Sequence, residues 1–344
     1  MSTVVPGSTA EGPVEDALQP PPAPALAAPG RPAGRSLAVA AAVVVALAVV
    51  PFVAPPDVAS LLTRVLAVAL LAASLDVLVG LGGMPSLGHA APFGVGAYAA
   101  ALTAKELTPW APAQLLLGIL GGLLLSVAVG WLVVRARGTY FLMLSLAVAE
   151  LVHTSADRFA GLTGGSNGLV GVPALTFLPG GEPVLLAGLV YWWGLLVAVA
   201  GFAVLVVVSR SAFGRTLRGL RDNEERMASL GYATMLVKYK AFCLCGAVAG
   251  AAGAVYAAQS RFVSPADLGF QVSVVALLAV IIGGRGSLWG PVLGAALVVL
   301  VRDEVGPRLD GRGPLLLGLV FIAAVYLLPR GIAGARLPRR RADR

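Results

Sequence analysis

Ionisable side chains are scarce in this sequence, and they gather in a few places. Asp, Glu, Lys and Arg make up 12% of the 344 residues. The largest group occupies residues 209–240, the only long polar run between apolar segments. Elsewhere, Glu150, His153 and His89 lie within apolar surroundings. No His, Cys or carboxylate cluster has metal-site spacing, and no nucleophile, base and orienting group stand out together. These residue types make an enzyme the least favoured class of function.

The charges of residues 209–240 have helical order. Arg218 and Asp222 stand four residues apart, and so do Arg221 and Glu225. Side chains at this spacing are neighbours on a helix surface, so opposite charges can pair there. The spacing therefore predicts two ion pairs along one short helix.

An apolar stripe runs along the same predicted helix and consists of Leu217, Leu220 and Met227. Gly231 is predicted to end the helix, because glycine tolerates the left-handed conformation of a helix C-terminus. An amphipathic helix between two membrane spans is a rigid surface element on which another protein can dock. The alternatives are a solvated basic loop that obeys the positive-inside rule, or a contact with lipid headgroups.

Glu150 and His153 lie three residues apart and share one helix face. A charged carboxylate in a membrane helix is costly unless it is near an interface, paired, or facing water. Glu150 either faces a permeation path or ties helices together, or it belongs to an interfacial pair, since Asp157 and Arg158 follow closely. For His89, a hydrogen bond to neighbouring backbone is favoured over ligand binding.

Composition indicates the fold class. Hydrophobic residues make up 58% of the chain, and the mean hydropathy is +0.88. Both values are higher than is typical of soluble globular domains. The sequence therefore predicts an all-α polytopic membrane protein. The formal charge of +8 does not indicate nucleic-acid binding, because the basic residues lie at helix ends and tails without interleaved aromatic residues.

About ten transmembrane helices are predicted, some of them discontinuous. Glycines and prolines interrupt residues 80–107, and such breaks are tolerated where backbone faces a cavity or neighbouring helices. Gly118 with Gly122, and Gly246 with Gly250, have the spacing that lets helix backbones approach closely. The predicted spans are residues 37–53, 58–79, 80–107, 111–134, 137–152, 184–208, 240–259, 270–282, a ninth ending near residue 301, and 314–328.

The basic residues concentrate on one side of this topology, which places both termini in the cytoplasm. Residues 1–35 are predicted to be a disordered cytoplasmic tail, because they are rich in Pro, Ala and Gly and lack apolar periodicity. The predicted permease domain covers residues 36–330 and includes the cytoplasmic loop 209–240. Residues 331–344 form a second, basic tail.

Five segments resemble motifs of the LivM-type branched-chain amino acid permeases of ABC transporters. One of them, RGTYFLMLSLAVAE, resembles the family's RGxYF…LxxxE pattern and ends at Glu150. The central loop, SAFGRTLRGLRDNEERMASLG, resembles the EAA loop of that family, and SLGHAAPFGVGAY resembles its SLGHAAFFGIGAY-like motif. LTGGSNGLVGVP is similar to LTGGxxGLxGxP, and GGRGSLWGPVLGA to GGxGSLxGPxxGA. Met84 stands where the family usually has Gln, and Pro85 and Pro92 replace apolar residues.

The resemblance implies roles for particular residues. By this comparison the EAA-like loop is a coupling helix that sits in a cleft of the ATPase subunit. The coupling residues implied are Arg215, Arg218, Arg221, Asp222, Asn223, Glu224 and Gly231. The substrate-pathway candidates are Ser86, Gly88, His89, Tyr98, Glu150, Thr163, Gly164, Gly165 and Asn167.

The glycines of LTGGSNGLVGVP leave two interpretations open. Adjacent glycines can expose amides that bind an anion, whereas a turn-rich connector is the simpler interpretation. No strand precedes the segment and no Lys-Ser/Thr follows it, so it is not a nucleotide-binding loop. ATP and Mg are therefore expected on separate ATPase subunits, and this chain is expected to bind no cofactor or metal.

The resemblance also implies partners, substrate and location. The expected partners are a second permease of the LivH type, two ABC ATPase subunits, an extracytoplasmic solute-binding protein and the lipid bilayer of a bacterial inner membrane. The implied function is import of leucine, isoleucine and valine. Urea, short amides and aromatic acids remain alternative substrates. A secondary transporter is the alternative class of protein, because secondary transporters also contain broken helices and intramembrane Glu and His residues.

Overall fold

The computed structural model describes residues 33–53, 55–306, 315, 318–319, 321–323, 326 and 331–334. The chain divides into two compact units, residues 1–46 and 47–344. Of the first unit, the structure describes the beginning of α1 (Ala33–Val53). The predicted tails and the predicted span 314–328 lie largely outside the described residues.

In its described part the second unit consists of helices and the segments between them, with two isolated β-bridges and no strands. The predicted all-α class is confirmed there. Three helices continue into π-helical turns, at Val77–Leu81, Thr103–Leu107 and Val301–Val305. The helices are α2 (Pro56–Asp76), α3 (Ala90–Leu102), α4 (Ala111–Val133), α5 (Thr139–Arg158), α6 (Ala160–Thr163), α7 (Ala187–Arg210), α8 (Ala212–Asp222), α9 (Glu224–Ser229), α10 (Thr234–Ser260), α11 (Phe270–Gly283) and α12 (Trp289–Leu300).

Five of the described helices are long and apolar enough to cross a membrane. They are Pro56–Leu81, Ala111–Val133, Thr139–Arg158, Ala187–Arg210 and Thr234–Ser260. Ala42–Phe52 and Phe270–Gly283 are shorter apolar helices. The chain is therefore a multi-pass helical membrane protein, and the number of ten spans stays a prediction.

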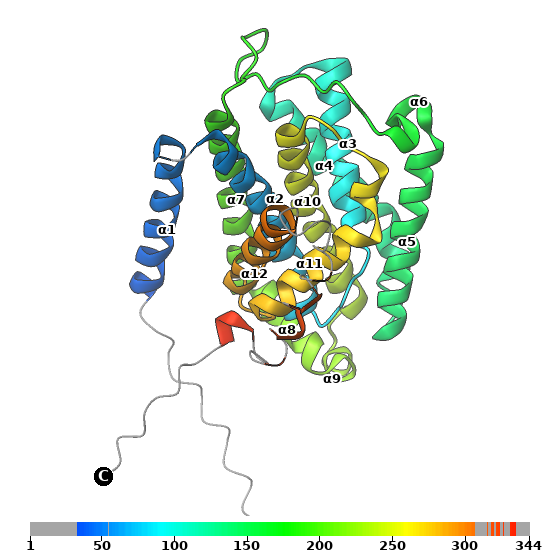
Figure 1. The fold of residues 1–344 in the computed structure, drawn as a ribbon. Coiled ribbons are helices and arrows are strands. Elements are labelled where there is room, and N and C mark those ends of the chain that lie inside the picture. The colour runs from blue at the N-terminus through cyan, green and yellow to red at the C-terminus, as the bar shows by residue number, and fades with distance from the viewer. Residues whose placement is uncertain are drawn as a thin grey trace, which may run out of the picture. The chain divides into compact units, whose positions relative to one another are not determined.

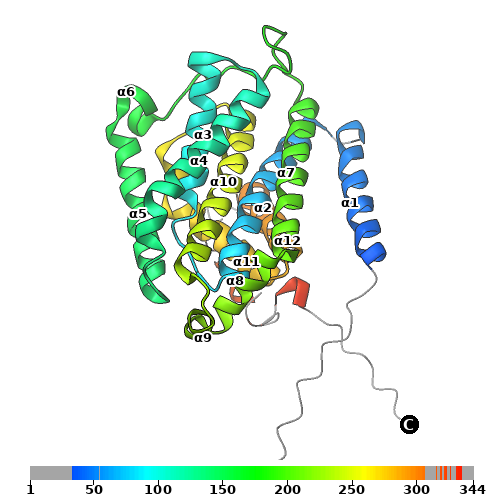
Figure 2. The same cartoon turned by 180° about the vertical axis from the view of Figure 1, so that it is seen from behind.

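The helix α10 is the most enclosed of these five spans, and 83% of its most apolar stretch is buried within the protein. In Figures 1 and 2 it lies between α3, α4 and α2. Its glycines meet those of α4 backbone to backbone: a Cβ on Gly250 would lie 2.4 Å from the Gly118 carbonyl oxygen, and a Cβ on Gly122 would lie 2.4 Å from that of Gly246. The predicted close packing at these glycines is confirmed.

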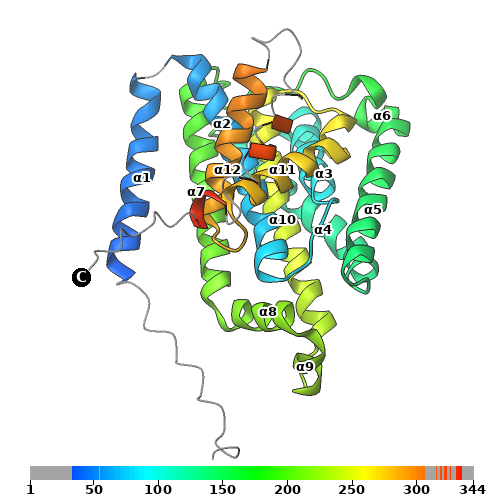
Figure 3. The ribbon, with the colours of Figure 1, turned by 60° about the horizontal axis from the view of Figure 1, so that its bottom comes forward.

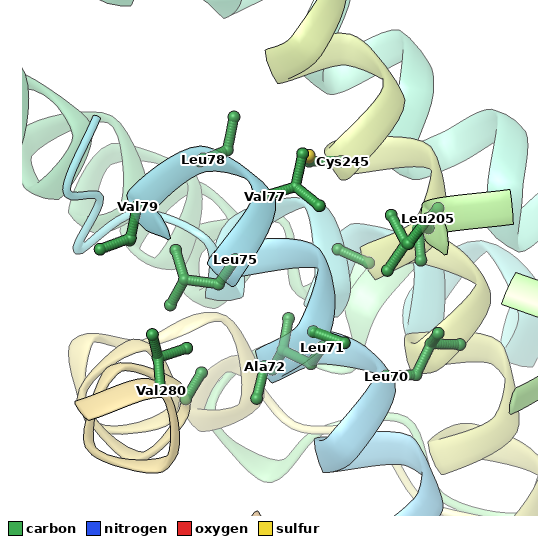
Figure 4. Close-up of a cluster of buried hydrophobic side chains, with 14 of the residues drawn as sticks. Leu70, Leu71, Ala72, Leu75, Val77, Leu78, Val79, Leu205, Cys245 and Val280 are labelled. Carbon is green, nitrogen blue, oxygen red and sulfur yellow. The ribbon is translucent and has the colours of Figure 1, made fainter. Parts of the chain in front are cut away.

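The helix α2 lies beside α10 and carries much of the hydrophobic core. Figure 4 shows its Leu71, Leu75 and Leu78 among side chains from three other helices, including Leu205 of α7 and Val280 of α11. All five side chains are buried. Because α2 packs against α7, α10, α11 and α12, most residues of its second half are buried, as a continuous apolar run predicts.

Two predictions for residues 209–259 differ from the structure, and the span predicted at residues 137–152 continues to Arg158. The span predicted at residues 240–259 begins at Thr234, because Lys238 is buried by an ion pair and does not mark the membrane surface. The single amphipathic helix predicted in residues 209–240 is two helices, α8 and α9, which run across the ends of the spans (Figure 3).

Candidate functional site

Residues 82–89 interrupt the helical course between the π-turn of α2 and α3, which confirms the predicted break in residues 80–107. The break frees backbone amides that must find acceptors in a membrane. Three serine hydroxyls accept from them. They are Ser145 of α5 for the Leu87 amide at 3.1 Å, Ser86 for Gly88 at 3.2 Å, and Ser273 of α11 for Ala90 at 2.9 Å.

His89 is buried at the end of this break. Its Nε2 lies 2.8 Å from the hydroxyl of Ser74 on α2, and Ser74 also donates to the Leu71 carbonyl at 2.7 Å. The predicted backbone partner of His89 is therefore wrong, since the partner is a side chain from a neighbouring helix. Its Nδ1 is buried without a protein partner among the described residues.

The break residues are enclosed within this chain. Ser86, Gly88 and His89 are all buried, and a Cβ on Gly88 would lie 2.1 Å from the Ser145 carbonyl oxygen. The motif SLGHAA therefore packs the break tightly against α5. Its predicted role in the substrate pathway stays a prediction.

The α8–α9 loop, residues 209–240, is divided by Asn223. Asn223 has extended backbone, with φ −160°, and its side-chain oxygen accepts from the Arg226 amide at 2.8 Å as the N-cap of α9. An Asn side chain that satisfies a free amide favours a new helix start over continuation. Because Arg221 and Glu225 fall on different helices, the predicted pair between them does not form.

The arginines of α8 hold backbone carbonyls where the sequence predicted ion pairs. Arg218 donates to the Ser209 carbonyl at 2.9 Å, so its predicted pair with Asp222 is also wrong. Arg221 donates to the Gly80 carbonyl and lies 3.5 Å from its neighbour Asp222. The loop is thereby tied to the end of α2.

Of the other features predicted for the loop, the glycine end is confirmed, whereas the apolar stripe is divided between two helices, because Leu217 and Leu220 lie on α8 and Met227 lies on α9. Leu217 and Leu220 are buried, and Met227 packs against the core. Gly231 follows α9 with φ +85°, and its amide donates to the Ala228 carbonyl at 2.9 Å. The α8–α9 loop is thus an amphipathic surface element with a glycine-dependent end.

A polar pocket of about 220 Å³ lies between the break, the α4–α5 turn and the α8–α9 loop. Glu224 of α9 lies at its edge, where it accepts a hydrogen bond from the buried Lys238 of α10 and lies 3.6 Å from Arg137. Sequence reasoning did not select Lys238 or Arg137, because no sequence spacing relates them to Glu224.

Glu150 lies on the outward face of α5. Its side chain is 49% exposed, and its Oε2 lies 3.8 Å from Nδ1 of His153, which confirms the predicted shared face. Tyr140, Met143 and Leu151 are exposed on the same helix. Among the described residues Glu150 therefore ties no helices together, and its exposed half faces lipid, water or a second protein.

The predicted glycine-rich segment is a tight turn rather than an open concavity. The amides of Gly164 and Gly168 donate to carbonyls within the turn, and that of Gly165 donates to the Thr163 hydroxyl at 3.2 Å. Leu169 pairs with Val263 in an antiparallel bridge. These contacts favour the connector interpretation over anion binding.

The pathway candidates thus lie in four places. Ser86, Gly88 and His89 lie in the break, and Glu150 lies on the surface of α5. Tyr98 is buried on α3. The end of α6 and the turn after it hold Thr163, Gly164, Gly165 and Asn167. The structure does not bring them together in one cavity. Among the residues with described structure, no group of three or more His, Cys, Asp or Glu side chains is placed to hold a metal ion.

Sequence reasoning missed the importance of Asp76. This side chain is fully buried at the end of α2. Its carboxylate accepts from the Gly286 amide at 2.7 Å and the Leu288 amide at 3.2 Å. The sequence showed both a carboxylate in an apolar span and a glycine motif at residues 283–290, but nothing in it related the two.

Comparisons with known proteins agree with this architecture. The sequence model of the family described as "Branched-chain amino acid transport system / permease component" matches residues 57–328. The chain is 29% identical over 314 residues to the high-affinity branched-chain amino acid transport system permease protein LivM of Escherichia coli (strain K12), which covers 84% of this chain and 73% of that protein. LivM of Salmonella typhimurium matches over the same extent.

A more distant relative is the autoinducer 2 import system permease protein LsrC of Escherichia coli (strain K12 / DH10B). It is 32% identical over 194 residues, which cover 53% of this chain and 52% of that protein. No solved structure matches the chain. Because the family model spans most of the sequence, the chain belongs to the branched-chain amino acid transport permeases of ABC transporters, and within them it resembles LivM.

Proposed function

We propose that this chain is the LivM-type permease subunit of an ATP-driven importer that carries leucine, isoleucine and valine into a bacterial cell. The proposed complex contains a second permease of the LivH type, two ABC ATPase subunits and an extracytoplasmic solute-binding protein. The relatives' names support the substrate class. The alternatives within the same mechanism are urea, short amides and aromatic acids.

The ATP-driven mechanism is supported mainly by the α8–α9 loop, which has one side packed against the chain and one side exposed. Its inner side is fastened to the chain by buried Leu217 and Leu220 and by the bond from Arg221 to Gly80. Its outer side exposes charged groups beside Leu230 and Tyr232, which are 66% and 48% exposed. A fastened helix pair with a charged and apolar outer surface suits docking in the cleft of an ATPase, which explains the loop better than a solvated connector does.

The proposed substrate pathway runs along the outward face of α5. A carboxylate on a membrane span is tolerated where it meets water or a polar partner, and Glu150 is half exposed on that face. A second permease packed around this face would enclose Glu150 in a path shared by the two chains. The buried break residues around His89 would then pack against the inner face of α5 and hold this helix in position.

The proposed function is tested by reconstitution in vesicles. The permease pair, ATPases and binding protein are purified together, and uptake of radiolabelled leucine is measured with and without ATP. We expect uptake that requires ATP, the ATPases and loaded binding protein. Uptake that persists without ATPases would identify a secondary transporter, and competition by urea, acetamide or phenylacetate but not by isoleucine would redirect the substrate class.

The proposed orientation places both termini and the α8–α9 loop in the cytoplasm. In a background with Cys243 and Cys245 replaced, a cysteine at Ser166 is expected to react with an impermeant maleimide in intact cells. A cysteine at Ser229 is expected to react only after the membrane is opened. Both native serines are exposed in this chain, so access and not burial decides the outcome. Labelling in the opposite sense would invert the topology.

Glu150→Gln is expected to reduce ATP-driven leucine uptake severalfold while leaving the amount of protein in the membrane unchanged. The amide keeps the shape of the side chain but removes the charge and weakens the contact with His153, which lies 3.8 Å away. Glu182→Gln is a suitable control because Glu182 is exposed in the loop before α7. Full uptake in Glu150→Gln would make the residue an interfacial bystander.

A further inference from the structure

Asp76 is the centre of a junction between three parts of the chain that are distant in sequence. The junction consists of Asp76 and Gly80 at the end of α2, Arg221 of α8, and Gly286 and Leu288 in the turn between α11 and α12. The carboxylate of Asp76 is fully buried. A buried carboxylate costs free energy unless it is hydrogen-bonded, and here both of its oxygens accept backbone amides of that turn.

The backbones within the junction are in direct contact. A Cβ on Gly80 would lie 2.3 Å from the Gly286 nitrogen and 2.4 Å from Oδ1 of Asp76. A side chain at Gly80 would not fit, so the backbones of these two segments pack directly against each other and are joined by the hydrogen bonds of Asp76. The end of α2 and the turn between α11 and α12 are therefore one packed body.

Arg221 fastens α8 to the same body. Its guanidinium donates to the Gly80 carbonyl, and its stem covers Gly83, where a Cβ would lie 2.6 Å from Cγ of Arg221. A displacement of α8 therefore pulls on the last turn of α2 through a charged donor.

The junction also leads to the break before α3. The helix α11 begins its course beside that break, where its Ser273 accepts the Ala90 amide at 2.9 Å. Continuous contacts thus connect α8, the end of α2, the α11–α12 turn and the residue after His89. Coupling between distant sites is carried by such packed and hydrogen-bonded elements when they move together.

We infer that Asp76 is a positioning residue that transmits movement of the α8–α9 loop to α11, α12 and the break at residues 82–89. This inference rests on the proposed function, because it needs an ATPase that moves the loop. Glu224 fastens α9 separately, to Lys238 and Arg137. Since α8 and α9 meet at the extended residue Asn223, the junction directs the movement of α8 in particular.

The test is Asp76→Asn in the complete reconstituted complex. Asn keeps the size of the side chain but presents an N–H₂ group to an amide that is itself a donor, so one of the two hydrogen bonds is lost. We expect ATP-driven leucine uptake to fall about tenfold or more, because losing a hydrogen bond to a buried carboxylate weakens the junction by about this factor in an equilibrium constant. ATP hydrolysis is expected to continue but to lose its response to loaded binding protein.

A distance measurement separates transmission from general damage. Cysteines at the exposed positions Ala212 of α8 and Leu293 of α12, in a background without Cys243 and Cys245, carry spin labels. In the otherwise unchanged complex the distance distribution is expected to keep its width when ATP is added, because the junction moves as one body. With Asp76→Asn, ATP is expected to broaden or split it.

Two further variants make the result decisive. Asp303→Asn is the matched control, because Asp303 forms ion pairs with Arg64 and Arg302 outside the junction, and it is expected to behave like the unchanged complex. If Asp76→Asn fails to assemble, Arg221→Gln opens the junction from its half-exposed side and is expected to give the same uncoupling.

The possible failures are distinguishable. Wild-type uptake and an unchanged distance distribution in Asp76→Asn or Arg221→Gln would overturn this inference and leave the proposed function standing. If the unchanged complex shows no ATP-dependent uptake, both the proposed function and this inference are wrong.

Discussion

Gly231→Val is expected to abolish the coupling between ATP hydrolysis and leucine uptake while the permease still folds. Gly231 has φ +85°, and a β-branched residue in this region costs about 1–2 kcal/mol or more. No atom of the described residues lies within 4 Å of a Cβ at this position, so the cost is backbone strain and not a collision. The chain is expected to relieve the strain by shifting the end of α9, which misplaces the proposed docking surface.

The measurement is uptake and ATPase activity in vesicles, together with the yield of the assembled permease pair. Gly180→Val is the matched control, because Gly180 has φ +74° and equally open space but lies in the loop between α6 and α7. We expect the control to retain coupling despite similar strain. If Gly231→Val transports as well as Gly180→Val does, the α8–α9 loop has no part in coupling.

Gly250→Val is expected to prevent stable folding of the membrane domain. A Cβ at this position would lie 2.4 Å from the Gly118 carbonyl oxygen and 3.1 Å from the Gly122 Cα. Both obstacles are backbone of α4 and cannot rotate away as a side chain can, so α4 and α10 must separate. Overpacking typically costs 1–3 kcal/mol and occasionally more, and we expect about 3 kcal/mol or more here because α10 is the most enclosed span.

Stability in detergent is measured as the temperature at which the monodisperse gel-filtration peak is lost. Gly188→Val is the matched control, because Gly188 is also helical and a Cβ there meets only Pro51, at 3.4 Å. We expect the control to stay close to the unchanged protein while Gly250→Val aggregates. Similar melting of the two variants would show that α4 and α10 are not held by backbone contact at these glycines.

The sequence alone determined the class of the protein and the identity of its elements. A continuous apolar run predicts a buried or membrane-spanning helix whatever its neighbours are, so most spans were located to within a few residues. The glycine pairs of α4 and α10 were recognised because close packing needs a small residue at every fourth position. The left-handed conformation of Gly231 was also predictable, because a glycine directly after a helical segment is enough to indicate it.

Only the tertiary structure decided which polar groups meet. The predicted pair of Arg218 failed because the Ser209 carbonyl binds its guanidinium group. The predicted pair of Arg221 failed because Asn223 starts a new helix before Glu225, and Arg221 donates to the Gly80 carbonyl instead. Ion pairs at a helix surface are worth only a few tenths of a kcal/mol, so spacing within one helix does not decide such a competition.

The partners of the buried groups also come from distant parts of the chain. Asp76 accepts hydrogen bonds from residues more than 200 positions away in the sequence. The free amides of the break before α3 donate to Ser145 and Ser273, which lie on two other helices. Local periodicity reports which face of a helix is apolar. It carries no information on which helix will lie against that face, because the pairing is decided by packing of the whole domain.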